Sequence, residues 1–502
     1  MIRFAAIARR ALLMAGVAGL GVLVGAVAVF LLLSGPASPL QLWHTVSLDE
    51  EFTAERAAEV RTFEDYRQLE DRLFAELDEK VYAETGTGPE YALVRYSRGS
   101  AADPGRHDPR WNRSFELPAD APRGGVLLLH GMSDSPYTFR TMGQELNRRG
   151  YWVLGLRMPG HGTVPAGLKT LTLEDMTAAV RLGVAHLASR IGPDPRTGQP
   201  AVHIMGYSTG APLALDYALD AFAGLAAPKP ASLVLVSPAI GLSPAAALAG
   251  PLTRLARLPG LESLAWTQVQ PEYDPYKYNS FTANAGAQVH RLTRSVAGRI
   301  ATGARTGPIA GFPPTLVFLS TVDATVSAAA VVDHLLEHLA PEGHELVLFD
   351  LNRQSVSSTV MIADPGPLTA RLMAGPSLPF ALTLVANESA QSARVISLRK
   401  PARSQEPAAE PLDLAWPTGV LSLSHVALPF PPDDPLYGQG PPANADVVFL
   451  GQIAVQGERG LLLVPSDQLL RLRHNPFFAY LARRAVEWME NSGHHDPGAV
   501  QH

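Results

Sequence analysis

The chain has 502 residues, of which 46% are hydrophobic and 18% charged, and its formal net charge is -6. This length and apolar content suffice for one large buried core or two smaller ones, which excludes an intrinsically disordered protein. The acidic balance and the scattered lysines and arginines exclude a nucleic-acid-binding surface. Because the sequence contains no cysteine, disulfides, thiolate metal sites and a cysteine nucleophile are also excluded.

An apolar segment near the N-terminus predicts a membrane anchor. Residues Ala11–Leu33 contain no polar side chain, and Arg3, Arg9 and Arg10 precede them. About 20 apolar residues can cross the hydrocarbon core of a bilayer. The arginines are expected to keep the N-terminus cytoplasmic, so residues 1–33 form a cytoplasmic stub and a transmembrane helix, and the rest lies outside, in the periplasm if the source is bacterial. A cleaved signal peptide is the alternative, although its apolar part is usually only ~7–15 residues long.

Residues 34–90 are expected to form a tether, from about Ser34 to Thr45, followed by an amphipathic helix. Apolar residues recur at helical spacing from Phe63 to Val81, with Thr62 as a candidate N-cap and Gly86 as a candidate stop. Because this helix is acidic, we expect it to pack on the following domain rather than on an anionic membrane. At the other end of the chain, residues 492–502 are expected to form a flexible tail.

From residue 91 onward, short apolar strands alternate with helical stretches. This alternation predicts an α/β fold with a mostly parallel central sheet and helices on both faces. The core is assigned to residues 91–240 and 312–491, interrupted by insertions at 241–311 and 351–423. The first insertion mixes apolar and aromatic residues with few charges, as a cap over a pocket does. The expected strands are Val126–Leu129, Trp152–Leu156, His203–Met205, Leu233–Val236, Thr315–Leu319 and Glu345–Phe349. A proline-rich surface loop is expected at Lys400–Pro411.

A G-x-S-x-G pattern, Gly206 to Gly210, lies between an apolar strand and a helical stretch. In this context the two glycines permit a sharp turn that projects the hydroxyl of Ser208 from the edge of the sheet. A serine that only caps the following helix is the alternative, but capping does not require both glycines. We therefore predict that Ser208 is a catalytic nucleophile.

A site for the oxyanion is predicted where the apolar strand before His130 opens into a polar loop. The backbone N–H groups of Met132 and Thr209 are the expected donors to a tetrahedral intermediate, and the loss of one such donor costs ~10²–10³ in rate. His130 itself is interpreted as a residue that shapes the loop.

These motifs resemble the α/β-hydrolase family, in particular its monoglyceride-lipase and serine-aminopeptidase-like branch of carboxylesterases. The resemblance covers roughly residues 91–491 and implies a triad in the chain order serine, acid, histidine. The matching stretches are "LLLHGMSDSPYTFR", "LRMPGHGTVP", "GYSTG", "LVSPAI", "LVFLSTVDATV" and "SHVALPFPPDDPLYG".

The acid and the base are assigned by position within this order. Asp323 follows the apolar strand "TLVFLS" at the carboxyl edge of the sheet, where such folds keep their sites, and Asp350 is the alternative acid. His425 ends a β-like run downstream of the acid and is the expected base, with His474 as its main rival. His161, in "PGHG", is interpreted as a loop residue near the mouth of the site.

One feature departs from the family pattern. In simpler members the histidine follows the last main strand almost at once, whereas here Leu351–Leu423 intervenes and contains two strand-like pieces, "FALTLVAN" and "ARVISLR". The sequence therefore leaves open which strand supports His425.

The predicted protein is a membrane-anchored serine hydrolase that cleaves carboxylic esters through an acyl-enzyme, without a cofactor or metal. Its expected partners are a small acyl ester and, through the N-terminal helix, the lipid bilayer; the sequence does not identify a protein partner. A serine peptidase or an acyltransferase of the same fold is the alternative. A non-catalytic binding protein of this fold is less compatible with the presence of all three triad candidates.

Overall fold

In the computed structural model of the protein, the described residues are 14, 16–19, 21, 25, 39–195, 197–241, 256, 261–341, 343–355, 361–362, 364–375, 378–441, 448–451 and 471–492. The chain divides into two compact units, Met1–Gln41 and Leu42–His502. Most of the predicted anchor, Ala11–Leu33, lies outside the described residues. Among the residues that are described, no helix is long and apolar enough to cross a membrane.

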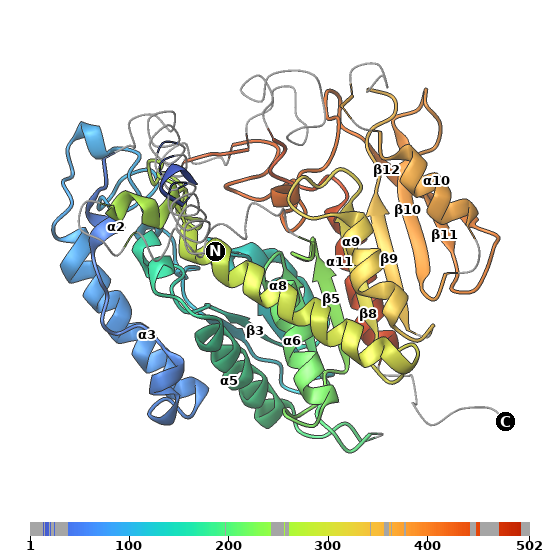
Figure 1. The fold of residues 1–502 in the computed structure, drawn as a ribbon, viewed down its shortest axis with the longest axis horizontal. Helices are drawn as coiled ribbons and strands as arrows, with labels where there is room; N and C mark the ends of the chain where they lie inside the picture. The colour runs from blue at the N-terminus through green and yellow to red at the C-terminus, as the bar shows by residue number, and fades with distance from the viewer. Residues whose placement is uncertain are drawn as a thin grey trace, which may run out of the picture. The chain divides into compact units, whose positions relative to one another are not determined.

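The second unit is built on a ten-stranded sheet (Figure 1). The strand order is β1-β3-β2-β4-β5-β8-β9-β10-β11-β12, and the strands from β3 to β10 pair in parallel. The outer strands β1, β11 and β12 are antiparallel to their neighbours. The bounds are β1 Phe115–Leu117, β2 Gly125–Leu129, β3 Trp152–Leu156, β4 Val202–Tyr207, β5 Ser232–Val236, β8 Thr315–Ser320, β9 His344–Phe349, β10 Ala381–Asn387, β11 Arg394–Lys400 and β12 Ala408–Ala415. All six predicted strands are confirmed.

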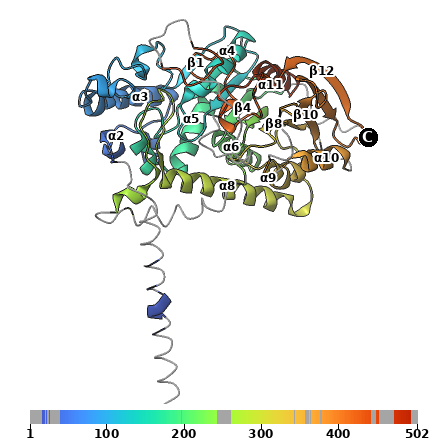
Figure 2. The ribbon, with the colours of Figure 1, turned by 90° about the horizontal axis from the view of Figure 1, so that it is seen from above.

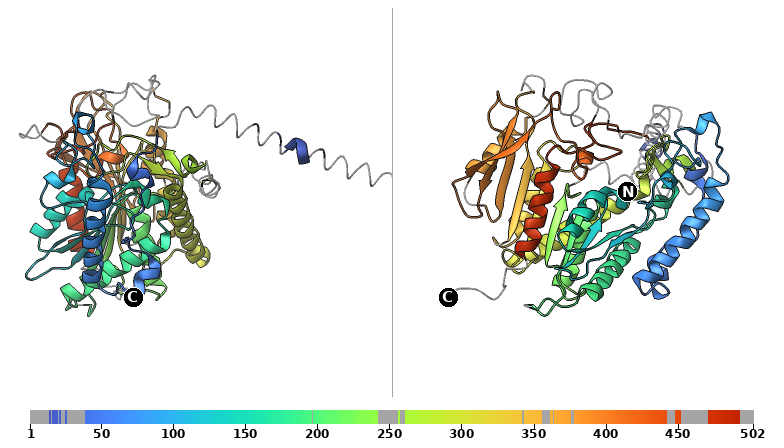
Figure 3. Two further views of the ribbon diagram at one scale, coloured as in Figure 1. Left: turned by 90° about the vertical axis from the view of Figure 1, so that its left-hand side faces the viewer. Right: turned by 180° about the vertical axis from the view of Figure 1, so that it is seen from behind.

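Helices cover both faces of the sheet, which explains why its central strands are mostly apolar. One face packs against α4 (Arg140–Arg148) and α11 (Phe478–Ser492). Helix α11 is the red helix in the right panel of Figure 3, which shows the molecule from behind. The opposite face packs against α5 (Leu173–Ile191), α6 (Gly210–Phe222), α9 (Ala328–His334) and α10 (Gly366–Ala374), as Figure 2 shows. This layering is that of an α/β-hydrolase fold.

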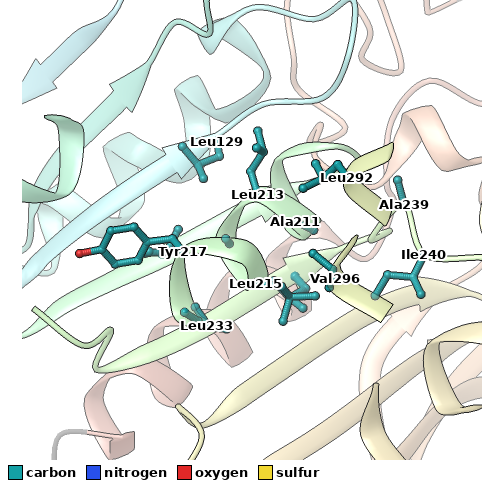
Figure 4. Close-up of a cluster of buried hydrophobic side chains, with 14 of the residues drawn as sticks. Leu129, Ala211, Leu213, Leu215, Tyr217, Leu233, Ala239, Ile240, Leu292 and Val296 are labelled. Carbon is teal, nitrogen blue, oxygen red and sulfur yellow. The ribbon is translucent and has the colours of Figure 1, made fainter. Parts of the chain in front are cut away.

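The region predicted to be a cap contributes to the core. Its long helix α8 (Ala283–Gly303) packs on α6, and Leu292 and Val296 of α8 meet Ala211 and Leu215 of α6 in a buried apolar cluster (Figure 4). Two short strands precede α8, β6 (Trp266–Gln268) and β7 (Phe281–Thr282). Much of the remaining predicted cap, residues 242–255 and 257–260, lies outside the described residues.

The predicted amphipathic helix is confirmed as α3 (Phe63–Leu77), which continues as a π-helical turn to Tyr82. Thr62 is its N-cap and forms a capping box with Asp65. The helix packs on the hydrolase core as expected, because the hydroxyl of Tyr66 donates to the carbonyl oxygen of Arg157 at 2.7 Å. The buried guanidinium of Arg157 in turn pairs with Glu70 at 2.8 Å.

The prediction of a tether is wrong for its last residues, because Leu42–Thr45 are folded. A short helix, α2 (Leu42–Thr45), buries Trp43 and His44, and His44 Nε2 lies 3.0 Å from Ser280 Oγ. Burial lowers the pKa of His44 to about 4, so the imidazole is neutral at pH 7. The remaining short helical turns are Ala54–Ala58, Pro89–Tyr91, Pro104–Arg106, Pro136–Phe139, Pro165–Lys169, Glu262–Ala265, Ala304–Thr306, Leu336–His338 and His425–Ala427.

The insertion 351–423 extends the sheet instead of interrupting it. The two strand-like pieces form β10 and β11, but the predicted surface loop Lys400–Pro411 is wrong at both ends. Lys400 ends β11 with its ammonium buried and donating to the carbonyl oxygen of Gly375 at 2.8 Å. Residues 408–411 begin β12, an exposed edge strand, where proline and charged residues are tolerated and discourage pairing with other chains.

Candidate active site

Ser208 occupies a sharp turn between β4 and α6. Its φ is +52°, a left-handed conformation that costs a non-glycine residue energy and is typical of functional turns. The turn is so tight that a Cβ on Gly206 would lie 2.3 Å from the carbonyl oxygen of Gly210. A Cβ on Gly210 would lie 2.0 Å from the carbonyl oxygen of Leu129. Both glycines of the motif are therefore required by close packing, and the serine side chain remains partly accessible.

The two predicted oxyanion donors lie next to this serine. Thr209 follows Ser208 directly in the sequence. Met132 follows Gly131, and Gly131 lies so close to the serine that a Cβ on it would be 3.0 Å from Ser208 Cβ. Within the described part of the chain, no protein acceptor is paired with the backbone N–H of Met132 or of Thr209. Two unpaired amides beside a hydroxyl are the arrangement that stabilisation of an oxyanion requires.

The structure brings Ser208, His425 and Asp323 together although they are far apart in sequence. Ser208 Oγ lies 3.0 Å from His425 Nε2, and His425 Nδ1 lies 2.8 Å from Asp323 Oδ2. Both distances are those of hydrogen bonds, so the three side chains form a continuous chain from hydroxyl to carboxylate. With Nδ1–H donating to the carboxylate, the lone pair of Nε2 accepts the hydrogen bond of the serine hydroxyl and can take its proton.

The surroundings of Asp323 keep its carboxyl group ionised. Its side chain is fully covered, and its Oδ1 accepts the N–H groups of Thr325 at 2.8 Å and Val326 at 2.9 Å. Burial opposes ionisation, but the charge of His425, its hydrogen bond and the two backbone N–H groups together lower the pKa of Asp323. The carboxylate therefore carries its negative charge at neutral pH, where it can orient an imidazole and stabilise an imidazolium.

The strand that supports His425 is β9, although the histidine follows β12 in sequence. Asn352, three residues beyond the end of β9, donates its backbone N–H to the carbonyl oxygen of Leu421 and its side-chain Nδ2 to that of Val420, each at 2.8 Å. On the other side, the hydroxyl of Tyr207 donates to the carbonyl oxygen of His425 at 3.3 Å. The histidine thus returns to the same sheet edge as the serine and the acid.

The rival acid and base are occupied elsewhere. Asp350 pairs with Arg353 at 3.1 Å, and His474 Nδ1 lies 3.3 Å from the carbonyl oxygen of Tyr437. His161 is buried, with Nδ1 2.8 Å from the carbonyl oxygen of Pro159. These contacts are local and structural, and none of them involves the serine hydroxyl.

His130 shapes its loop, as predicted. Its Nδ1–H donates to the carbonyl oxygen of Gly131 at 2.9 Å, and its Nε2 accepts the backbone N–H of Met158 at 3.1 Å. Burial lowers the pKa of His130 to about 4, so the ring stays in this neutral tautomer at pH 7.

Two residues outside any sequence motif hold the oxyanion loop. The backbone N–H of Tyr278 donates to the carbonyl oxygen of Ser133 at 2.8 Å, and Lys277 Nζ lies 3.0 Å from Asp134 Oδ1. The only sequence signal for this contact was the aromatic stretch "PEYDPYKYNSF" in the predicted cap.

A cavity of 140 Å³ lies elsewhere, beside α3, and no triad candidate lines it.

A hydroxyl, an imidazole and a carboxylate in this order, at the carboxyl edge of a mostly parallel sheet, define the class. The protein is an esterase- or lipase-like serine hydrolase of the α/β-hydrolase fold.

Comparison with known proteins agrees with this class. Residues 120–352 match the family described as "Serine aminopeptidase, S33". The chain is 25% identical over 239 residues, 47% of this chain and 77% of the relative, to a thermostable monoacylglycerol lipase from Bacillus sp. (strain H-257). These matches confirm the resemblance to the serine-aminopeptidase and monoglyceride-lipase branch over residues 120–352, which include the first strands of the α/β-hydrolase fold.

Solved structures similar to this chain include lipolytic enzymes. One belongs to the metagenome-derived enzymes LipS and LipT, at 20% identity and a TM-score of 0.37, covering 47% of this chain and 87% of that one. Another is the monoacylglycerol lipase of Paleococcus ferrophilus, at 19% identity and a TM-score of 0.35, covering 47% and 88%. A third is a soluble variant of Saccharomyces cerevisiae monoglyceride lipase, at 16% identity and a TM-score of 0.36, covering 47% and 81%.

Proposed function

We propose that the protein hydrolyses carboxylic esters with Ser208 as nucleophile, His425 as general base and Asp323 as the acid of the triad. The observation that carries this proposal is the hydrogen-bonded chain through the three side chains, with distances of 3.0 and 2.8 Å. It is supported by the strained turn at Ser208 and by the adjacent backbone N–H groups of Met132 and Thr209, which pair with no acceptor among the described residues.

The reaction follows from this geometry in two balanced steps. His425 Nε2 takes the proton of Ser208 as Oγ attacks the ester carbonyl carbon, and the oxyanion is stabilised by the N–H groups of Met132 and Thr209. The imidazolium then gives its proton to the leaving alkoxide, so that an alcohol departs and an acyl-serine remains. A water molecule repeats the sequence, releases the carboxylic acid and regenerates the serine hydroxyl.

A monoglyceride-like acyl ester is the substrate class that we propose. The curated relative is a monoacylglycerol lipase. Around the oxyanion loop, Tyr276 stacks on Tyr137 with ring centroids 4.0 Å apart, and the neighbouring Lys277 is neutralised by Asp134. Both rings are buried, and Lys277 and Asp134 neutralise each other beside the loop, which suits a neutral ester better than a charged peptide terminus.

The substrate proposal is tested by comparing esters with amides. With p-nitrophenyl esters from acetate to laurate, we expect kcat/KM to exceed that for aminoacyl p-nitroanilides by at least about 100-fold, the size of effect that one or two matched contacts produce. The highest value is expected for a short or medium chain. The matched control is Ser208→Ala, which must lose both activities. A higher kcat/KM for any aminoacyl amide than for every ester would identify a peptidase instead, and transfer to an added alcohol in preference to water would identify an acyltransferase.

We also propose that Ala11–Leu33 anchors the enzyme in a membrane with its hydrolase unit on the extracytoplasmic side. The support is the uninterrupted apolar composition of this stretch and the arginines before it. We expect the full chain to stay in the membrane fraction after a high-salt wash and its hydrolase unit to be digested by protease added from outside. The matched control is a chain lacking residues 1–38, which is expected in the soluble fraction. Release of the full chain as a soluble protein that begins near residue 38 would contradict the anchor.

A further inference from the structure

The sheet extension β10–β12 separates His425 from β9 by more than seventy residues, yet the histidine lies within hydrogen-bond distance of the serine and the acid. Such an arrangement needs contacts that return the histidine loop to the sheet edge, because a loop at the end of a long insertion is otherwise free to move. These contacts are made by two buried asparagines, Asn352 after β9 and Asn387 at the end of β10.

Asn352 binds the histidine loop directly. It is 1% exposed, and it donates its backbone N–H to Leu421 and its Nδ2 to Val420, at 2.8 Å to each carbonyl oxygen. These two acceptors lie four and five residues before His425. The short segment between Leu421 and His425 is also fixed. Leu423 is fully buried, and the hydroxyl of Ser424 donates to the carbonyl oxygen of Leu472.

Asn387 holds Asn352 in turn. Its Nδ2 donates to Asn352 Oδ1 at 3.1 Å and to the carbonyl oxygen of Ser392 at 2.7 Å. Its Oδ1 accepts the backbone N–H of Arg353 at 2.8 Å. The side-chain amide of Asn352 is therefore oriented by the added strand, so that its Nδ2 faces the histidine loop.

We propose that Asn352 and Asn387 form a positioning clasp through which the sheet extension sets His425 at its working distance from Ser208. This inference rests on the proposed function and deepens it: the extension is part of the machinery that positions the base. Since Asn352 Nδ2 and Asn387 Nδ2 act in series, loss of either amide loosens the same contact to the histidine loop. A displacement of the base by about 1 Å is enough to cost ~10²-fold in rate.

The test compares Asn352→Ala, Asn387→Ala, the double variant and Asn147→Ala in the full-length protein. Asn147 is the matched control, because its Nδ2 also donates to backbone carbonyl oxygens, those of Leu117 at 3.0 Å and Pro118 at 2.8 Å, but at the opposite edge of the sheet. For Asn352→Ala we expect kcat for a p-nitrophenyl ester to fall by about 10- to 100-fold, with KM changed by less than about threefold.

The kcat of the double variant distinguishes two asparagines that act through one contact from two asparagines that act independently. Because the two amides act in series, we expect the double variant to have nearly the same kcat as Asn352→Ala alone, a non-additive result. Asn387→Ala, which keeps the direct bonds of Asn352, is expected to lose less and serves if Asn352→Ala does not fold. Asn147→Ala is expected to lose thermal stability while its kcat below the melting temperature stays within about twofold of wild type.

A second readout does not depend on turnover. The proton between His425 Nδ1 and Asp323 is expected to give a far-downfield proton NMR resonance in the wild type, weakened or absent in the clasp variants and retained in Asn147→Ala. If the wild-type protein did not hydrolyse esters, the proposed function would be overturned. The resonance would still show whether the two asparagines position His425. Clasp variants with wild-type kcat and an unchanged resonance would overturn the clasp.

Discussion

Replacement of Ser208 with alanine is expected to lower kcat for ester hydrolysis by about 10⁴- to 10⁶-fold, as loss of the nucleophile does in other serine hydrolases. The substitution removes one oxygen from a partly accessible side chain, and the backbone bond from its N–H to the carbonyl oxygen of Val236, 2.9 Å, is kept. The melting temperature should therefore change little. His425→Ala is expected to lose activity to a similar extent, because the two side chains act as a unit.

The matched control for Ser208→Ala is Ser237→Ala. Ser237 also follows a strand directly and has a positive φ of +44°, but it is fully buried. Its alanine variant should retain kcat within about threefold of wild type, since no step of the mechanism uses its hydroxyl. Retention of wild-type hydrolysis by purified Ser208→Ala would show that another residue is the nucleophile.

Replacement of Asp323 with asparagine is expected to lower kcat by about 10⁴-fold. The asparagine fits the same space, and its carbonyl oxygen can still accept the N–H groups of Thr325 and Val326. Its amide, however, donates toward His425 Nδ1, which forces the proton onto Nε2 and leaves no acceptor for the serine proton. It also removes the negative charge that stabilises the imidazolium.

The control for Asp323→Asn is Asp216→Asn on α6. Asp216 is likewise a buried carboxylate, paired with Arg299 at 2.7 Å, but it is not bonded to the triad. It should lose stability and keep its kcat within about threefold. The steady-state kcat of both variants, measured below their melting temperatures, decides the assignment: equal kcat values for the two would remove Asp323 from the triad.

The parallel strands and the serine turn were predictable because their causes are local. A strand buried on both faces must be apolar along its length, and a left-handed turn against neighbouring backbone needs glycines at defined positions, so β2, β4 and the turn at Ser208 are visible in the sequence. Asp323 was predictable for a related reason, since it lies three residues after the end of the apolar strand β8.

Other features depend on contacts between distant residues. Asn352 and Lys277 lie in no motif, and their roles arise only when β10 reaches β9 and the segment before α8 reaches the oxyanion loop. The edge strand β12 was predicted as part of a loop because its side chains are mostly exposed, which removes the alternating pattern of a half-buried strand. The folding of α2 was missed because only two of its side chains, Trp43 and His44, are buried.

The central claim is that a strained turn, an imidazole and an ionised carboxylate make Ser208 a nucleophile. It is tested most directly by labelling the purified protein with a fluorophosphonate and locating the modified residue by peptide mass spectrometry. We expect one labelled residue, Ser208, with labelling lost in Ser208→Ala and retained in Ser237→Ala. Labelling at a different serine, or no labelling of the folded wild-type protein, would contradict the claim.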